Sequence, residues 1–144
     1  MKHYRTTPHS KYDLKVHIVF IPKYRKPVLY GQVGLKARDL IRQICTGLDV
    51  EILSGKLARD HVHLFVSYPP YLSISDLVQK IKGKSAYKLF SSFPDLRQIF
   101  WGRHFWARGY LAVSSGNLTD EMIRDYIEQQ AGEDLKQGEI TVGD

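Results

Sequence analysis

Four stretches of the chain are predicted to be strands, and the first alternates apolar and polar residues, which is the pattern of a strand that buries one face of a sheet. In the first stretch, Leu14, Val16 and Ile18 occupy every second position, and Pro22 follows directly. Proline ends a strand because it lacks the N–H that the sheet ladder needs. The four predicted strands cover residues 12–21, 49–57, 61–68 and 105–113. A short turn around Arg59-Asp60 separates the second strand from the third, which predicts a hairpin.

Three other stretches repeat apolar residues every three or four positions, which predicts amphipathic helices. The first covers residues 33–47, where Gly47 supplies a C-terminal stop. Ser73 is the predicted N-cap of the second helix, which runs to about Phe90. The third helix covers about residues 119–131.

The predicted order of elements is strand, helix, strand, strand, helix, strand, helix, which indicates an α+β fold. The first six elements match a ferredoxin-like arrangement, in which an antiparallel sheet of about four strands carries helices on one face. The seventh is an additional C-terminal helix, and Tyr126 lies on it. We expect a single domain over residues 1–144, with a core at about 12–131, a loose polar arm at 1–11 and a polar, fraying tail at 132–144.

Basic residues exceed acidic ones, so that the formal net charge is +6 and the isoelectric point is about 9.4. This excess favours polyanionic partners such as nucleic acid, although a solvated cationic surface without a partner is the alternative. Aromatic side chains stack on unpaired bases, and Trp101 and Trp106 are the candidates in a basic segment. The candidate DNA contacts, chosen from charge and placement, are Lys23, Arg25, Lys80, Lys84 and Arg103.

No apolar run approaches the roughly 20 residues of a membrane helix, and the N-terminus lacks the apolar stretch of a secretory signal. The single cysteine, Cys45, lies among apolar helix positions, which predicts a small buried residue without a disulfide partner. We therefore expect no membrane partner and a cytoplasmic location, with association to the nucleoid when DNA is bound.

The candidate chemistry begins with the triplet His61-Val62-His63. Residues i and i+2 of a strand point to the same face, so both imidazoles project side by side and could share one divalent metal ion. The alternative is a pair of exposed histidines without a metal. A preceding carboxylate, Asp60, favours the metal interpretation.

Tyr126 and Gln130 lie four residues apart on the last predicted helix and therefore share one of its faces. Packing alone could explain the tyrosine, and a helix-end position could explain the glutamine. Combined with the two histidines, however, an amide oxygen and a phenol complete a site that suits metal-assisted attack on a phosphodiester, with tyrosine as the nucleophile.

Four stretches together resemble the HUH single-tyrosine transposases (histidine, hydrophobic residue, histidine) of the smallest bacterial and archaeal insertion sequences, the IS200-like family. The stretches are Val16–Arg25, Asp60–Leu64, Ile81–Ser85 and Tyr126–Gln130. The triplet alone is weakly specific, whereas its combination with the K-Y-R loop, the I-K-G-K-S helix and the Y-x-x-x-Q helix is strongly specific. The resemblance covers about residues 12–131.

This resemblance implies an RRM-like sheet and an ion, Mg²⁺ or Mn²⁺, bound by His61, His63 and Gln130. It implies that Tyr126 attacks single-stranded DNA, which produces a 5′-phosphotyrosine link and a free 3′-hydroxyl that later rejoins strands. The implied substrates are imperfect hairpins at the ends of the element. The implied assembly is a homodimer with composite sites, in which Ser115 and Gly116 could form a hinge for the tyrosine helix.

Three alternatives stay open at this level. A replication or repeat-processing nuclease of the HUH superfamily would use the same residues. A non-catalytic module that binds single-stranded nucleic acid would need the basic surfaces and no metal. A metal hydrolase that uses water as its nucleophile would make Tyr126 dispensable.

Overall fold

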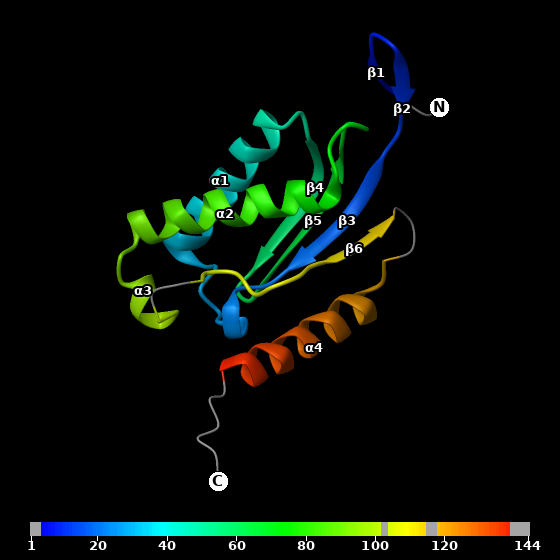
Figure 1. Cartoon of the computed structure of the whole chain (residues 1–144). Coiled ribbons are helices and arrows are strands. Elements are labelled where there is room, and N and C mark those ends of the chain that lie inside the picture. Colours follow the sequence, from blue (N-terminus) through cyan, green and yellow to red (C-terminus); the bar gives the residue numbers. More distant parts are fainter. Residues whose placement is uncertain (1–3, 102–103, 115–117, 139–144) are drawn as a thin grey trace.

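A four-stranded antiparallel sheet forms the centre of the protein (Figure 1). The computed structural model describes residues 4–101, 104–114 and 118–138, and at 131 and 133–138 it describes the backbone alone. The strands are β3 (Lys15–Phe20), β4 (Glu51–Ala58), β5 (His61–Ser67) and β6 (Leu111–Ser114), in the order β4-β5-β3-β6. Helices connect β3 to β4 and β5 to β6, which confirms the predicted ferredoxin-like α+β arrangement.

Two long helices, α1 (Gly31–Gly47) and α2 (Ile74–Ser92), cover one face of this sheet (Figure 1). The covered face is the one that carries the apolar residues of the predicted alternation, because Val62, Leu64 and Val66 of β5 are almost completely buried. Ser73 caps α2 as predicted, since its hydroxyl accepts a hydrogen bond of 3.0 Å from the backbone N–H of Asp76.

The last helix, α4 (Asp120–Gly138), lies on the other side of the sheet (Figure 1). It contacts the short 3₁₀ helix η1 (Lys23–Arg25) and packs through Ile127 against Ile21 and Ala107. These three apolar side chains are at most 5% exposed and form a small second core. The helix is longer than predicted: residues 132–138 continue it, so the expected fraying tail is wrong for them, and 139–144 lie outside the described residues.

The segment before β6 does not form the regular strand that was predicted, although Trp106 makes an isolated antiparallel bridge to Pro22. Regular pairing with β3 covers only β6, so the strand predicted over 105–113 is wrong in its first part. Gly109 has a φ of +79°, which interrupts any run of strand geometry. Two side chains of α2 also hold the segment: Ser85 accepts a hydrogen bond of 2.9 Å from the buried indole of Trp106, and the ammonium of Lys82 donates to the carbonyl of Ala107 at 2.8 Å.

The N-terminal segment is also more ordered than predicted. Strands β1 (Arg5–Thr7) and β2 (Ser10–Tyr12) form a hairpin where the sequence predicted a loose arm. The guanidinium of Arg5 ties this hairpin to the end of the sheet, through the carboxylate of Asp49 at 2.9 Å and the carbonyl of Ser67 at 3.0 Å. These partners are more than 40 residues away in the sequence, so the local sequence pattern does not predict these contacts.

The predicted loop over 91–103 contains a one-turn helix, α3 (Leu96–Ile99). Cys45 is buried as predicted, and burial raises the pKa of its thiol to about 11. Within the residues that the structure describes, none of the helices combines the length and apolar character that crossing a bilayer requires.

Candidate functional site

Both candidate metal ligands, His61 and His63, lie on the face of β5 that α1 and α2 leave uncovered. They line a cavity of about 280 Å³ between the end of the sheet, η1 and α4. The other described residues that line it are Arg25, Lys56, Asp60, Asp120, Ile123, Arg124 and Ile127. The strand spacing therefore predicted correctly that the two imidazoles share one side of the sheet.

His61 is held by the residue before it. Its Nδ1 lies 2.9 Å from one carboxylate oxygen of Asp60, and the other oxygen accepts a hydrogen bond of 2.8 Å from Nε of Arg25. Partial burial opposes ionisation of Asp60, but the hydrogen bonds and charges of Arg25 and His61 outweigh it and hold the pKa of this carboxyl below its usual range. Asp60 is therefore a carboxylate at neutral pH.

His63 has a different neighbour, His17 on β3. Nδ1 of His17 lies 3.0 Å from Nε2 of His63, and the ring of His17 stacks on Phe65 with centroids 4.2 Å apart. Burial lowers the pKa of both imidazoles, and the charges of His17, His61 and Lys56 lower that of His63 further against the opposing effect of Asp120. Both rings are accordingly neutral at pH 7, which is the state that ligates metals.

Sequence reasoning did not assign His17 to the site. The signal was available, because the buried positions of β3 on the helix side are Val16, Ile18 and Phe20. His17 lies between them and so faces the same side as the histidine pair. The register between β3 and β5 decides which odd-numbered residue of β3 lies beside His63. That register is known only from the folded sheet.

Tyr126 and Gln130 do not line this cavity, although both lie on α4. Four residues of α4 line the cavity, namely Asp120, Ile123, Arg124 and Ile127. Tyr126 packs on the small second core. Gln130 is only 7% exposed and points toward Gly109, where an added Cβ would lie 3.7 Å from its Oε1. The lining of this cavity thus includes His61 and His63 but neither Tyr126 nor Gln130.

The ligands that one chain supplies to this cavity are suitable for a divalent ion. Two imidazoles on one strand face are suitable ligands, and the Nδ1 contact of His61 leaves its Nε2 free of that partner. Among the side chains that the structure describes, no three from histidine, cysteine, aspartate and glutamate form a group that could hold a metal. The remaining ligands would therefore have to be of another kind, such as an amide oxygen, water or phosphate.

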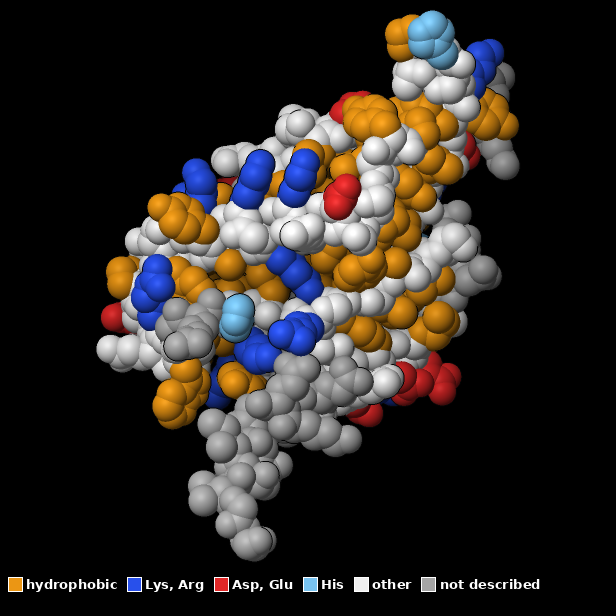
Figure 2. Space-filling view, in the orientation of Figure 1, with side chains coloured by type: hydrophobic (Ala, Val, Ile, Leu, Met, Phe, Trp, Pro, Cys, Tyr) orange, Lys and Arg blue, Asp and Glu red, His pale blue; other side chains and the backbone are white. Residues whose placement is uncertain are grey.

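The candidate DNA contacts lie in two places. Lys23 and Arg25 belong to η1, next to the histidines, whereas Lys80 and Lys84 are exposed on α2 and so lie across the sheet from them. Figure 2 shows Lys and Arg side chains in a row along α2. Three predicted positions, Arg103 and the hinge residues Ser115 and Gly116, lie outside the described residues.

The two tryptophans differ in their surroundings. Trp101 is 84% exposed, and a base could reach its ring. Trp106 is 6% exposed, belongs to the hydrophobic core and donates its N–H to Ser85. The prediction that Trp106 stacks on bases is therefore wrong for this arrangement.

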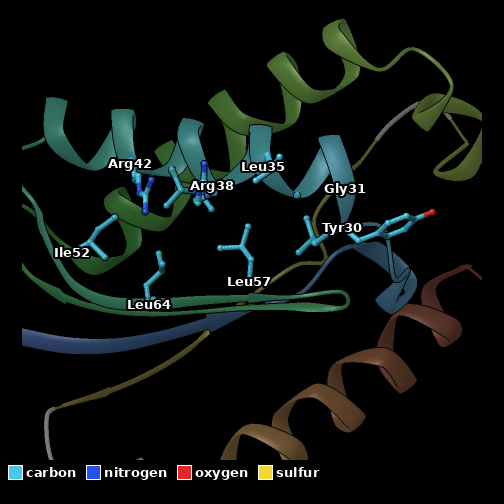
Figure 3. Close-up of a pocket in the computed structure, with 12 residues that line it drawn as sticks. Tyr30, Gly31, Leu35, Arg38, Arg42, Ile52, Leu57 and Leu64 are labelled. Carbon is cyan, nitrogen blue, oxygen red and sulfur yellow. The ribbon is translucent and has the colours of Figure 1, made fainter.

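A larger groove of about 550 Å³ runs between α1 and the sheet. Figure 3 shows Arg38 and Arg42 on α1 opposite Ile52 and Leu57 on β4. This groove lies on the helix-covered side and contains none of the predicted site residues. Its apolar floor is part of the packing between helix and sheet, and the candidate chemistry lies on the other side.

Comparison with known proteins agrees with the resemblance carried by the four motifs. The family model described as "Transposase IS200 like" matches residues 10–130. The transposase of insertion sequence IS200 from Salmonella typhimurium is 37% identical over 135 residues, which cover 94% of this chain and 88% of the relative. The ISDra2 transposase TnpA of Deinococcus radiodurans is 34% identical over 119 residues, which cover 83% of this chain and 85% of the relative.

Solved structures share the fold. A crystal structure assigned as a transposase from Deinococcus radiodurans R1 has a TM-score of 0.81 and 33% identity, and the match covers 88% of this chain and 97% of that one. A REP-associated tyrosine transposase bound to a REP hairpin has a TM-score of 0.53 and 15% identity, over 97% of this chain and 76% of that one, which shows a common fold. Because the family model and close relatives match most of its length, the chain belongs to the IS200-like transposase family, and it is a DNA-binding, DNA-cleaving enzyme of transposition.

Proposed function

We propose that this transposase cuts and rejoins single-stranded DNA through a covalent 5′-phosphotyrosine intermediate on Tyr126. The observation that carries the proposal is the pair of imidazoles, His61 and His63, which line one cavity together with Arg25, Lys56 and Arg124 on the side of the sheet opposite α1 and α2. The resemblance described above supplies the nucleophile. A divalent ion, Mg²⁺ or Mn²⁺, held by His61, His63 and Gln130 would polarise a phosphoryl oxygen and favour the phenolate.

The bond changes balance without any external energy source. The phenolic oxygen of Tyr126 forms a bond to phosphorus, the bond from phosphorus to the 3′ oxygen breaks, and that oxygen takes up a proton to become a free 3′-hydroxyl. A 3′-hydroxyl then attacks the phosphotyrosine, which rejoins a strand and returns the phenol. The number of phosphoester bonds stays constant, so ATP is not needed.

The charges around the cavity support a phosphodiester as its ligand. Arg25, Lys56 and Arg124 line it, against the two carboxylates Asp60 and Asp120. Arg25 is committed to Asp60 at 2.8 Å, which leaves Lys56 and Arg124 as the cations for phosphate oxygens. Lys56 pairs directly with His63 across the two strands and is therefore well placed to meet a phosphate beside the imidazoles.

The placement of Tyr126 supports a homodimer with composite sites. Within one chain, neither Tyr126 nor Gln130 belongs to the lining of the cavity that contains His61 and His63. The proposed site needs these two residues beside the histidines, and we propose that α4 of a second copy supplies them. Hairpin DNA is the substrate to test first, because the resemblance implies it and the REP-associated fold relative is bound to a hairpin.

The decisive experiment incubates the protein with labelled single-stranded DNA from the flanks of its gene, in Mg²⁺ or Mn²⁺. We expect an adduct that resists denaturation, maps to Tyr126 by mass spectrometry, is lost with EDTA and is absent with the complementary strand. Tight hairpin binding with no adduct, in both metals and with both strands, would instead favour the non-catalytic binding module.

A further inference from the structure

The side chains that surround His61 form a chain of contacts to which the family assignment gives no role. Asp60 bridges Nδ1 of His61, at 2.9 Å, and Nε of Arg25, at 2.8 Å. All three residues line the same cavity. The arginine belongs to the K-Y-R loop, where it is also a candidate DNA contact, and the aspartate ends the turn before β5.

We propose that Asp60, held in place by Arg25, is the positioning carboxylate of His61, which keeps the proton on Nδ1 and presents the lone pair of Nε2 to the divalent ion. This inference rests on the proposed function, because it needs His61 to be a metal ligand. It assigns Asp60 and Arg25 to the metal site as residues that act through His61.

The tautomer follows from the chemistry of the partners. A carboxylate can only accept hydrogen bonds, so the imidazole nitrogen that faces Asp60 must carry the hydrogen. In a neutral imidazole the other nitrogen, Nε2, then has the lone pair. Metal-bound histidines commonly have such an outer carboxylate, which fixes the ring orientation and raises the basicity of the ligand.

Arg25 gives Asp60 a single orientation. The guanidinium takes the carboxylate oxygen that His61 does not use, so both oxygens have partners on opposite sides. The loop that carries Arg25 is itself anchored, since the N–H of Arg25 donates to Pro22 at 2.9 Å and that of Lys23 to Phe105 at 2.7 Å. The backbone φ of Arg25 is 52°, a value that is rare for residues other than glycine. This value further restricts the conformations that the loop can adopt.

His63 offers an internal contrast. Its described hydrogen-bond partner is a second imidazole, His17, at 3.0 Å, and an imidazole can donate or accept. A neutral pair can therefore exchange roles, and nothing in this contact selects one tautomer of His63. Of the two histidines, His61 is therefore the one whose tautomer is fixed before metal binding, because its Nδ1 faces the carboxylate of Asp60.

The test measures Mn²⁺ affinity of the full chain without DNA, by electron paramagnetic resonance of the free ion. We expect Asp60→Ala to weaken Mn²⁺ binding by about 10- to 100-fold, which is typical for loss of an outer partner of a metal ligand. Asp60→Asn keeps a carbonyl acceptor and should lose less, and Arg25→Gln should also lose less. The matched controls are Asp39→Asn and Arg38→Gln, a second arginine–aspartate pair with a contact of 3.1 Å on α1, and these should bind Mn²⁺ like the wild type.

A second readout needs neither metal nor activity. Nitrogen-15 NMR of the metal-free protein should show His61 protonated at Nδ1, and Asp60→Ala should give a mixture of tautomers while thermal melting confirms the fold. Wild-type Mn²⁺ affinity in Asp60→Ala, or a wild-type His61 protonated at Nε2, would overturn the proposal. If Arg25→Gln leaves both the Mn²⁺ affinity and the His61 tautomer unchanged, Arg25 has no part in positioning His61.

Failure of the proposed function would have a different outcome. In that case His61→Ala and His63→Ala would bind Mn²⁺ as the wild type does, or the wild type would not bind it at all. The metal site would then be wrong even if NMR found the Nδ1 tautomer. Loss of Mn²⁺ binding in both histidine variants, together with an unaffected Asp60→Ala, would keep the metal site and reject the positioning role.

Discussion

Nδ1 of His17 on β3 lies 3.0 Å from Nε2 of His63 on the neighbouring strand β5. Such a contact needs one nitrogen with a hydrogen and one with a lone pair, so the two rings cannot both be imidazolium and keep it. The pKa of each imidazole is lowered, that of His17 by burial and that of His63 by burial and by nearby cations that include His17. This relationship makes the metal-free protein sensitive to mild acid.

The free energy of unfolding of the metal-free protein should fall as the pH falls through about 6.5. In the unfolded chain the imidazoles have their ordinary pKa of about 6.5, whereas in the folded protein His17 and His63 take up protons only at lower pH. The unfolded state therefore binds more protons in this window, and the stability that is complete above pH 6.5 is lost toward the lowered folded pKa values. Urea unfolding between pH 7.5 and 5.0 measures this directly. A double variant, His17→Asn with His63→Asn, should flatten the profile, and an equal slope in that variant would contradict the assignment.

Replacing His17 alone should raise the pKa of His63. The charge of protonated His17 is one of the causes that lower it, and His17→Asn removes that charge while it keeps a polar side chain. NMR titration of the His63 ring protons gives the value in both proteins. A downward shift, or none, would show that burial alone accounts for the behaviour of His63.

Tyr126→Phe should abolish strand cleavage and leave hairpin binding largely intact. The change removes one hydroxyl, the proposed nucleophile, and the ring that packs on Ile21, Ala107 and Ile127 is kept. A cleavage gel and a binding titration on the same DNA separate the two effects. Persistent cleavage would indicate that water is the nucleophile and that the protein is a metal hydrolase.

A mixture of two inactive variants, Tyr126→Phe and His63→Ala, tests the composite site. If α4 of one copy completes the site of the other, the mixed dimer contains one site with intact histidines and an intact tyrosine, and cleavage should return after the subunits exchange. If each chain uses its own tyrosine, every site in the mixture lacks one partner and the mixture stays inactive. Each variant alone is the control.

Ser85→Ala should lower the free energy of unfolding by about 1–3 kcal/mol, the usual cost of leaving a buried donor without its acceptor. The hydroxyl of Ser85 accepts the hydrogen bond of the Trp106 indole at 2.9 Å, and both residues are buried. Ser91 on the same helix is exposed and is the matched control, because surface changes of this kind usually stay within roughly 0.5 kcal/mol. Equal stability of the two variants in urea would show that another group satisfies the indole.

The alternation of apolar residues was sufficient to predict the strands that form the centre of the sheet, and with them the side on which His61 and His63 lie. Both inferences depend on the two-residue period of a strand, which is a local property of the backbone. The helix capped by Ser73 was predictable for the same kind of reason, since its cap reaches only three residues along the chain. Local pattern failed where long-range contacts impose order, as in the hairpin that Arg5 ties to Asp49 and in the segment that Ser85 and Lys82 hold.

The composition of the candidate site shows the same division. The sequence placed two imidazoles on one face and a carboxylate before them, because these residues are neighbours on one strand. Strand register between β3 and β5 brings His17 to His63, and the path of η1 brings Arg25 to Asp60 across 35 positions. The four-residue spacing of Tyr126 and Gln130 set their common helix face, but the packing of Ile127 on Ile21 and Ala107 sets the direction in which α4 presents that face. That packing joins Ile127 to residues about 106 and about 20 positions earlier only after the chain has folded, so no local pattern encodes the angle of the helix.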